Sequence, residues 1–508
     1  MPMHFETNHR NTALTAVAFM AITLPWLNPF TSGPSPAAVP LLFSWACAAV
    51  LLGLSAWDFG RAPATRVMTV TAWAWLFAGL ISSLAGLCQY FGMSHLFSPW
   101  MSQAGLGEAF ANLRQRNQFA TLANISLAAL IGLASTRCLA GTNRFAPRLR
   151  WAVLAGAGLL AAGNAASSSR TGLVQLALLG VLYGVWGAGQ SPLVRRIVLV
   201  AGITYAVAAF ALPRLAGLDA GATGILARLH DGGPACASRL TLWGNVLHLI
   251  AQKPGAGWGW GELDYGHFIT LYPGARFCDI LDNAHNLPLH LAVELGVPVA
   301  ALICGVVAWL VIRARPWQER DARRQMAWAV LAVIGLHSLL EYPLWYGPFQ
   351  MAVLLCVGLL WHGRQMPNQA SNKALAPVLY ASAATLLIAF TAWAAWDYHR
   401  ISQIYLAVDE RSPAYRANTL DKIKASWLFQ DQVQFAELTT TELTPDNAAH
   451  INALAKAVLH FSPEARVVER LLDSALLLGD ADETAFYLAR YQAAFAAEAA
   501  RWAAAHGY

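Results

Sequence analysis

The chain has 508 residues, of which 57% are hydrophobic and only 12% are charged, and its formal net charge is +6. Soluble domains carry about 25% charged residues, so this composition excludes an ordinary soluble protein and indicates one that crosses a membrane several times. The positive charge does not indicate a nucleic-acid partner, because the arginines are dispersed over short loops between apolar runs.

Apolar runs that are long enough, or nearly long enough, to cross a bilayer fill most of the first 397 residues. We place about eleven spans at 13–30, 37–56, 68–90, 119–138, 149–165, 172–189, 197–213, 289–312, 326–341, 348–363 and 376–397. The first run follows a weakly basic start and is expected to be a signal-anchor helix. The sequence therefore predicts an all-α polytopic membrane core over residues 1–397, with one large loop at about 214–288.

Basic residues fix the expected orientation. They lie in every second loop, for example at Arg66, Arg148, Arg195 and Arg320. Short loops rich in lysine and arginine stay in the cytoplasm, so these loops and the N-terminus are expected there. The other loops, including 214–288, and the C-terminus are then expected to face outward.

The composition changes after the last expected span. From residue 398 onward the chain has 10 Lys and Arg against 14 Asp and Glu. Its helical periodicity is interrupted by Pro or Gly at four places, which is typical of paired amphipathic helices. Residues 398–508 are therefore predicted to form a soluble helical-hairpin domain similar to a tetratricopeptide solenoid. A docking surface for a partner protein and a passive cover for the membrane core are both consistent with this pattern.

Four outward segments collect the polar and aromatic residues that are unusual in a membrane protein. They are 112–119, which contains Arg116 and Gln118; 167–172, which contains Arg170; 214–288, which contains Arg239 and His285; and 341–346, which contains Glu341, Tyr342 and Tyr346. Outward arginines run against the charge bias of membrane proteins and usually have an anionic partner. Snorkelling arginines and an interfacial aromatic belt explain each segment equally well when it is taken alone.

His285 stands where the long outward loop meets an apolar run. Asn286 is a plausible N-cap and Pro288 suits a first helical turn, so His285 is expected at the N-terminus of the span at 289–312. The partial positive charge of a helix N-terminus disfavours imidazolium, and the ring is expected to be neutral and able to accept a proton. The same helix end can hold an anion such as phosphate. A capping or interfacial histidine is the alternative interpretation.

Cysteine usage agrees with the expected orientation. Of seven cysteines, only Cys236 and Cys278 fall in an outward loop. Two cysteines on the oxidising side of a membrane favour a disulfide, which would close a loop containing Arg239. Two unrelated thiols are the alternative.

Several motifs carry a family resemblance that covers residues 10–400. His285-Asn286, followed by Glu294 and Gly296, resembles the O-antigen ligase/Wzy-type membrane glycosyltransferase superfamily. The segments 114–119 and 340–346 resemble more closely the PglL-type bacterial protein O-oligosaccharyltransferases within it. The resemblance implies an enzyme of the bacterial inner membrane with a periplasmic site. Its implied partners are an undecaprenyl-diphosphate-linked glycan as donor and a protein with a Ser or Thr hydroxyl as acceptor.

The residues fit this chemistry. Arginine neutralises a diphosphate with a planar, permanently charged group, so we predict Arg170 and Arg239, with Arg116 as a weaker candidate, as its ligands. Neutral His285 is predicted as the base for the acceptor hydroxyl. Acceptor or sugar positioning is assigned to Gln118, Asn286, Glu341, Tyr342 and Tyr346. No cofactor and no metal are predicted, because arginines supply the positive charge; Asp279 and Asp282 are only a weak signal for a divalent cation.

Other functions remain open. Within the same class, the chain could be an O-antigen ligase acting on lipid A-core or a Wzy-type polymerase. A lipid-linked glycan transporter would use the arginines without chemistry, although transporters more typically have paired repeats and broken helices near the membrane midplane. A membrane scaffold is a third class. Replacement of His285 separates these functions, since a transporter or a scaffold should tolerate it.

Overall fold

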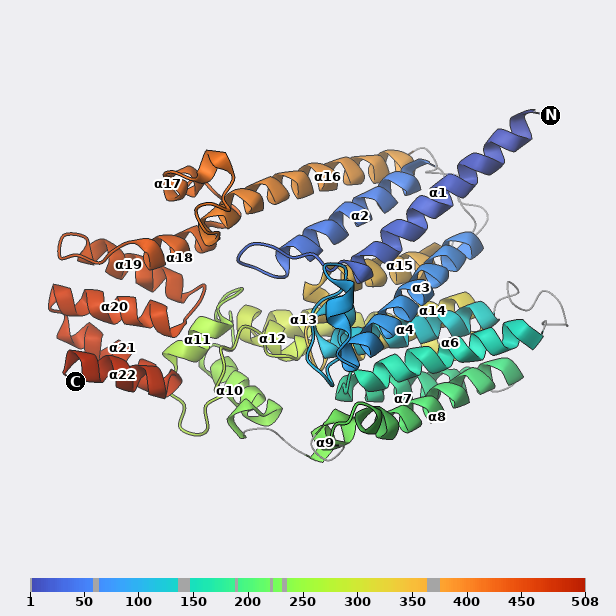
Figure 1. Cartoon of the computed structure of the whole chain (residues 1–508), viewed down its shortest axis with the longest axis horizontal. Helices are drawn as coiled ribbons and strands as arrows, with labels where there is room; N and C mark the ends of the chain where they lie inside the picture. Colours follow the sequence, from blue (N-terminus) through green and yellow to red (C-terminus); the bar gives the residue numbers. More distant parts are fainter. Residues whose placement is uncertain are drawn as a thin grey trace. The chain divides into compact units, whose positions relative to one another are not determined.

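The computed structural model describes residues 2–57, 64–135, 147–187, 191–219, 223–230, 235–362 and 375–507. Every regular element in these ranges is a helix (Figure 1). The chain divides into two compact units. Unit 1 comprises Met1–Thr31, Pro36–Asp231 and Val311–Trp393, and unit 2 comprises Ser32–Ser35, Gly232–Leu310 and Ala394–Tyr508.

Unit 1 contains most of the long apolar helices. They are α1 (Pro2–Leu27), α2 (Ala38–Trp57), α3 (Ala64–Tyr90), α4 (Arg116–Ser135), α6 (Pro147–Ala166), α7 (Arg170–Val185), α8 (Pro192–Leu215), α14 (Ala322–Ser338) and α15 (Gly347–His362), with the short α9 (Gly224–His230). α4 lies at the centre and packs against α3, α6, α7 and α14. Its described side chains are buried almost throughout.

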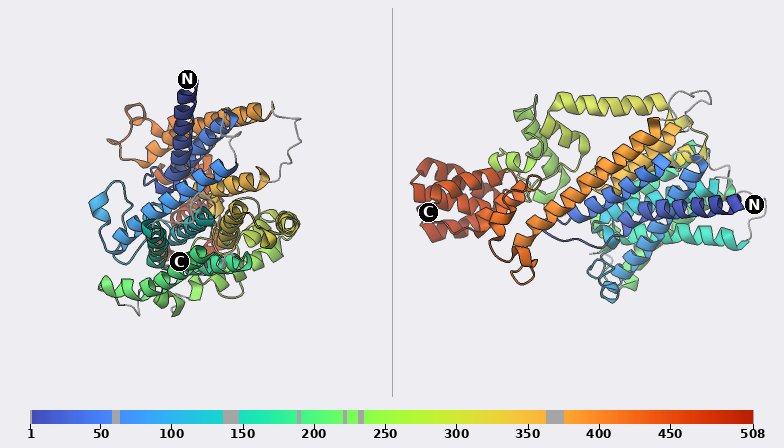
Figure 2. Two further views of the ribbon diagram at one scale, coloured as in Figure 1. Left: turned by 90° about the vertical axis from the view of Figure 1, so that its right-hand side faces the viewer. Right: turned by 90° about the horizontal axis from the view of Figure 1, so that it is seen from above.

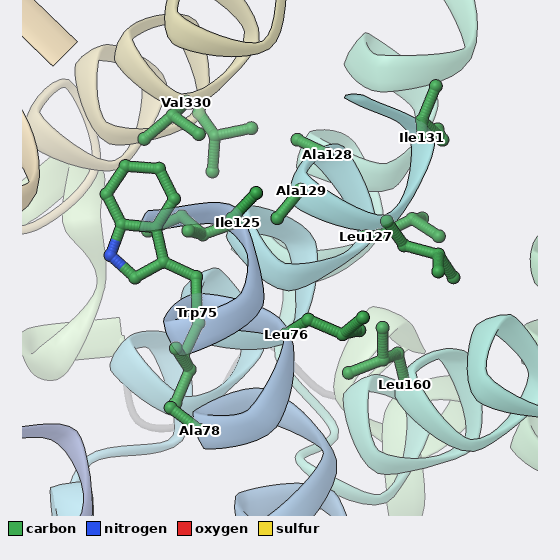
Figure 3. Packing of buried hydrophobic residues seen from close by; sticks show 14 of the residues in the cluster. Trp75, Leu76, Ala78, Ile125, Leu127, Ala128, Ala129, Ile131, Leu160 and Val330 are labelled. Carbon is green, nitrogen blue, oxygen red and sulfur yellow. The ribbon is translucent and has the colours of Figure 1, made fainter. Parts of the chain in front are cut away.

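The core of unit 1 is built from small and branched residues. Trp75 of α3 is 1% exposed and lies beside Ile125 of α4 and Val330 of α14 (Figure 3). A Cβ at Gly79, one helical turn further along α3, would overlap the side chain of Ser126. Small residues at such contacts let membrane helices approach closely, which is where dispersion contacts between them are gained. This packing makes the α3–α4 pair a rigid support for the turns at their ends.

Unit 2 combines residues 232–310, which contain most of the expected loop, with the C-terminal helices. Its elements before residue 311 are α10 (Arg239–Gln252), α11 (Leu263–Ile269), α12 (Leu287–Leu295) and most of α13 (Val297–Ala314). Its later elements, which follow α16 (Leu375–Ser402), are α17 (Thr419–Ile423), α18 (Gln430–Thr440), α19 (Ala448–Leu459), α20 (Ala465–Leu478), α21 (Ala481–Ala494) and α22 (Ala496–His506). The right-hand view of Figure 2 shows the C-terminal helices in red as a stack of layers.

One helix of the loop belongs to the core of this C-terminal stack. Phe268 of α11 is buried in the same apolar cluster as Leu471 and Leu472 of α20. Nearby, the ring of Tyr265 stacks on that of His460 with centroids 3.8 Å apart, and His460 Nδ1 lies 2.6 Å from Glu262 Oε2. Helix α11 of the expected loop and the C-terminal helices therefore share one compact unit, and the domain boundary at residue 398 stays a prediction.

The structure supports several of the expected membrane spans. Among the described residues, seven helices are long and apolar enough to cross a membrane, and the shorter apolar segments include Thr12–Leu27 of α1, Arg170–Val185 of α7 and Gly347–Trp361 of α15. An all-α polytopic membrane protein is therefore supported, while the number eleven stays a prediction. The expected ends at 138, 189 and 363 lie outside the described residues.

One expected span is divided. The run 289–312 is broken at Gly296, which ends α12 at a φ of 85°, and the membrane-spanning candidate begins only at Val297. A Cβ at Gly296 would overlap the backbone of Gly255, so the close approach of two backbone segments requires glycine here. His285 consequently precedes a separate nine-residue helix rather than the span itself.

Candidate functional site

In unit 1, a single amide joins three of the polar segments. Asn117, in the first turn of α4, donates from Nδ2 to Glu341 Oε1 over 2.9 Å. Its Oδ1 accepts a hydrogen bond from Ser169 Oγ over 2.6 Å. Segments 112–119, 167–172 and 341–346 therefore meet, and Glu341 is held by a neutral donor.

The turn before α7 places Arg170 at a helix N-terminus. Ser169 is the N-cap, and its Oγ accepts a hydrogen bond from Gly172 N over 2.9 Å. Arg170 follows as the first helical residue, and its side chain is exposed. A Cβ at Gly172 would overlap both Asn164 and Ala120, so only glycine allows this turn to pack against α4 and α6.

Three arginines gather around this turn. Arg116 Nη2 lies 2.6 Å from Glu108 Oε1, and Arg228 Nη1 donates to the backbone carbonyl of Ser168 over 3.1 Å. Burial lowers the pKa of Arg228, and the charges of Arg116 and Arg170 lower it further, while Glu341 opposes them. Gathered like charges repel one another, and an anion bound between them relieves that repulsion.

Arg228 was missed by sequence reasoning. It lies on the short helix α9, inside the expected outward loop, and no motif marks it. The available signal was its charge, because it is one more arginine in a segment where the positive-inside bias expects few. Arg116 and Arg170 were predicted, and both lie near enough to Arg228 for their charges to lower its pKa.

Gln118 and Tyr346 line a cavity in unit 1, and Arg116 does not belong to its lining. The rings of Tyr342 and Tyr346 stack with centroids 6.0 Å apart. Both tyrosines flank the short helix η7 (Pro343–Trp345), which leads into α15. The residues predicted to position acceptor or sugar in unit 1 therefore form one neighbourhood.

In unit 2, the backbone holds His285 in an uncommon conformation. Its φ is 49°, in the left-handed region that a non-glycine residue adopts only when its surroundings impose it. His285 N donates to Asn283 Oδ1 over 2.8 Å, and Asn286 Oδ1 accepts from Leu289 N over 3.1 Å as the N-cap of α12. The expected cap at Asn286 and the position of Pro288 in the first turn are confirmed.

Further along α12, a buried pair lies close to His285. His290 Nε2 is 3.4 Å from Glu294 Oε2, and these side chains are 3% and 2% exposed. Burial lowers the pKa of His290 to about 4, and the neighbouring imidazole of His285 adds to this effect. His290 is therefore neutral near pH 7, and His285 is the more accessible of the two imidazoles.

Arg239 begins the helix that supports the His285 segment. Ser238 caps α10 by accepting a hydrogen bond from Thr241 N, and Arg239 is the first helical residue. Trp243, one turn later on the same face, donates from Nε1 to the carbonyl of Ala284 over 3.1 Å. The structure thus places the start of α10 beside the residue that precedes His285.

A disulfide and a glycine-rich segment complete this part of unit 2. Cys236 and Cys278 are joined by a disulfide, with their Cα atoms 5.3 Å apart. In the segment 254–261, Trp258 N and Gly259 N donate to the carbonyls of Val293 and Glu294. A Cβ at Gly257 would overlap the Glu294 carbonyl, so the glycines serve backbone packing against α12.

Asp279 and Asp282 do not form a recognisable cation site. Within the described ranges, no group of three or more His, Cys, Asp or Glu side chains is arranged to hold a metal ion.

Comparison with known proteins gives three family matches. Residues 109–133 match a protein glycosylation ligase family, residues 155–304 match an O-antigen ligase family, and residues 325–507 match the C-terminal region of a virulence factor membrane-bound polymerase family. The second match contains His285, Arg170, Arg228 and Arg239, and the first contains Arg116 and Gln118. The chain is thus similar to the O-antigen ligase class of membrane glycosyltransferases.

Two similar proteins of known name are both O-oligosaccharyltransferases. A general O-oligosaccharyltransferase of Acinetobacter baylyi is 25% identical over 326 residues, which cover 61% of this chain and 53% of the relative. A ComP-specific O-oligosaccharyltransferase of the same organism is 25% identical over 289 residues, 56% of this chain and 50% of the relative. The predicted resemblance to PglL-type protein O-oligosaccharyltransferases is confirmed. The chain spans about half the length of these relatives, and no solved structure matches it.

Proposed function

We propose that this protein transfers a glycan en bloc from an undecaprenyl-diphosphate carrier to Ser or Thr hydroxyls of proteins. The observation that carries this proposal is the placement of three arginines around the turn at 167–169 of unit 1. Arg228 donates to the Ser168 carbonyl, Arg170 directly follows the turn, and Arg116 precedes Asn117, which bonds to Ser169. A diphosphate carries negative charge, opposite to that of the arginines. Guanidinium groups bind its oxygens through paired, charge-assisted hydrogen bonds. The match to a protein glycosylation ligase family over residues 109–133 supports a protein acceptor.

The arginines would assist departure of the carrier. As the bond between the anomeric carbon and the diphosphate oxygen breaks, negative charge develops on the leaving diphosphate. Fixed guanidinium groups stabilise that charge without reorganisation, which lowers the barrier to transfer. Arg239, at the N-terminus of α10 in unit 2, is proposed as a further ligand of the donor.

His285 is proposed as the general base. Its ring would accept the proton of the acceptor hydroxyl while that oxygen attacks the anomeric carbon. The left-handed backbone conformation at His285 and the N-cap at Asn286 restrict the positions that the imidazole ring can adopt. A role in orienting the acceptor is proposed for Glu341 and Tyr342, which belong to unit 1, and for Asn286, which belongs to unit 2.

The expected topology is part of the proposal. We assign the protein to the bacterial inner membrane, with a membrane core over residues 1–397 and with the loop and residues 398–508 in the periplasm. The disulfide between Cys236 and Cys278 supports an oxidising compartment for the loop. Alkaline-phosphatase fusions at Tyr508 and Arg320 test this topology: activity at Tyr508 and inactivity at Arg320 are expected, and the reverse would contradict it.

The function is tested by reconstitution. Purified protein in lipid is given a lipid-linked glycan and either a Ser/Thr-containing acceptor protein or lipid A-core, with and without EDTA. Transfer to the protein acceptor that persists in EDTA is expected. Transfer to lipid A-core alone would assign the chain to the O-antigen ligases, which the match over 155–304 makes the second candidate. Loss of transfer in EDTA would instead direct attention to Asp279 and Asp282.

A further inference from the structure

A cavity of about 270 Å³ lies within unit 1, apart from the three arginines. It forms where α1 ends, where α2 and α15 begin, and where the chain turns into α4. Its walls include Pro25, Pro40, Leu113, Arg114, Gln118 and Tyr346. This volume is close to the lower end of the range for small-molecule sites, about 300 Å³, so the cavity suits one small ring rather than an extended ligand.

Gln118 is the polar group that points to a ligand. The residue is 3% exposed and belongs to the lining of the cavity. Among the described residues, its backbone N–H bonds to Gln115 Oε1 over 2.7 Å, but its side chain makes no hydrogen bond. A carboxamide has two N–H donors and a carbonyl acceptor, so that of Gln118 can hydrogen-bond a ligand in the cavity. A ligand with hydroxyl or amide groups would supply the missing partners.

The other walls favour an uncharged ligand. Arg114 is the only residue among the lining set that carries a formal charge near neutral pH, and its Nη2 already donates to the carbonyl of Pro29. The lining contains no Asp or Glu, so nothing there favours a cation. A single engaged guanidinium is also a poor match for a diphosphate.

One turn of chain separates this cavity from the arginines. Arg114, Gln115 and Gln118 face the cavity. Between them, Arg116 bonds to Glu108 and Asn117 bonds to Glu341 and Ser169. The beginning of α4 therefore contributes residues both to the cavity and to the neighbourhood of the arginines.

We propose that this cavity binds a neutral sugar residue of the glycan, close to the diphosphate held by the arginines. A sugar ring offers C–H faces that pack against proline and leucine walls, and hydroxyl groups that bond to the Gln118 carboxamide. A prenyl chain would leave Gln118 unsatisfied, and an extended peptide would lack an edge strand to pair with among the described residues. The inference rests on the proposed function, since it identifies the sugar as part of the donor.

The test measures binding of free sugars and requires no transfer. Full-length protein is placed in phosphatidylcholine nanodiscs, which avoids detergents that carry sugar headgroups. Saturation-transfer NMR is recorded with free N-acetylglucosamine, N-acetylgalactosamine and galactose. At least one sugar is expected to bind with a Kd of about 1 mM, the weak affinity typical of few contacts.

Two variants probe the cavity, and one serves as the control. Ala37→Trp places a large ring at the cavity rim, and Gln118→Leu removes the buried carboxamide. Both should raise the sugar Kd at least tenfold. Ala38→Trp adds the same ring to the neighbouring residue, which does not line the cavity, and should bind sugar as the wild type does. Thermal unfolding midpoints close to that of the wild type establish that the variants are folded.

The outcomes separate this inference from the function. Sugar binding that is unchanged in Ala37→Trp, absent in the wild type, or displaced by farnesol would overturn the sugar site, even in a protein that transfers glycan. Sugar binding that is lost in Ala37→Trp but accompanied by no transfer to any acceptor would leave the site in place and defeat the proposed reaction.

Discussion

The indole N–H of Trp243 donates a hydrogen bond to the backbone carbonyl of Ala284 over 3.1 Å. This bond joins helix α10 to the residue directly before His285. The His285 N–H donates a hydrogen bond to Asn283 Oδ1. The carbonyl of Ala284 and the N–H of His285 are therefore both hydrogen-bonded to side chains. The position of the histidine is therefore set by Trp243, 41 residues before Ala284, as well as by its own helix α12.

Removing this bond should affect turnover more than donor binding. Trp243→Phe keeps most of the apolar ring and loses the N–H, and a neutral hydrogen bond contributes about 0.5–1.5 kcal/mol. We expect kcat to fall roughly 2- to 10-fold with an unchanged donor Kd. Trp186→Phe is the matched control, because it removes an indole bond to the Pro316 carbonyl in unit 1. An equal loss in both variants would show that the effect is not specific to His285.

His285→Ala tests the base directly. A general base contributes about 10²- to 10⁴-fold to a rate, so transfer should fall by that factor while donor binding remains. His450→Ala, an exposed histidine paired with Glu437 in the C-terminal helices, is the control and should transfer normally. Near-normal transfer by His285→Ala would remove this residue from the mechanism.

Arg228 is the candidate donor ligand that the structure indicates and that no sequence motif marks. Arg228→Ala should weaken donor binding roughly 10- to 100-fold, because a hydrogen bond between charged groups contributes about 1.5–3 kcal/mol. Arg228→Lys should restore only part of it, since the planar guanidinium geometry is lost. Arg501→Ala, a surface arginine of α22, should leave donor binding intact. Donor binding by Arg228→Ala at the wild-type level, with Arg170→Ala impaired, would exclude Arg228 from the diphosphate site.

The disulfide should stabilise unit 2 more than unit 1. Cys236 and Cys278 are 42 residues apart, for which the chain-entropy model gives about 4 kcal/mol. The double variant Cys236→Ser/Cys278→Ser should therefore show faster amide hydrogen exchange in α10 than the wild type. Cys304→Ser, which replaces a free cysteine, is the control. Two alkylatable thiols at 236 and 278 in wild-type protein from the periplasm would contradict the bond itself.

Asp264 should make the stability of unit 2 depend on pH. Burial raises the pKa of Asp264 to about 8, and the charges of Asp282 and Glu262 add to this, while the Tyr265 backbone N–H opposes it. A carboxyl with a raised folded-state pKa binds more protons in the folded state, so its contribution is complete below about pH 4 and is lost as pH rises through about 8. Wild-type protein should lose on the order of a few kcal/mol across this window.

Asp264→Asn keeps the shape and the acceptor but cannot ionise. Its free energy of unfolding should vary less between pH 5 and pH 8 than that of the wild type, as measured by denaturant titration at each pH. Asp421→Asn, at an exposed carboxyl, should preserve the wild-type slope. Parallel pH profiles for wild type and Asp264→Asn would show that Asp264 is ionised in the folded protein.

Features that depend on neighbouring residues in the chain were predictable from the sequence. Apolar runs gave the positions of the long helices, and the Asn286 cap follows from a side chain that can bond to a nearby backbone N–H. The break at Gly296 was missed, because a hydropathy window averages over a residue whose backbone must approach that of Gly255. Asn117 was also missed as a junction, since its partner Glu341 lies 224 residues away and only tertiary packing brings them together.

The presence of Phe268 in the same apolar cluster as Leu471 and Leu472 has a consequence for biosynthesis. Helix α11 leaves the ribosome about 200 residues before the partners that bury it, an interval of roughly 10–40 s at ordinary elongation rates. During that time Leu263 of α11 can already pack against α10, but Phe268 lacks the α20 side chains that bury it. Nascent chains should therefore depend on holdase chaperones between the emergence of α11 and that of α20, and ribosome stalling within 270–470 should expose α11 to proteolysis.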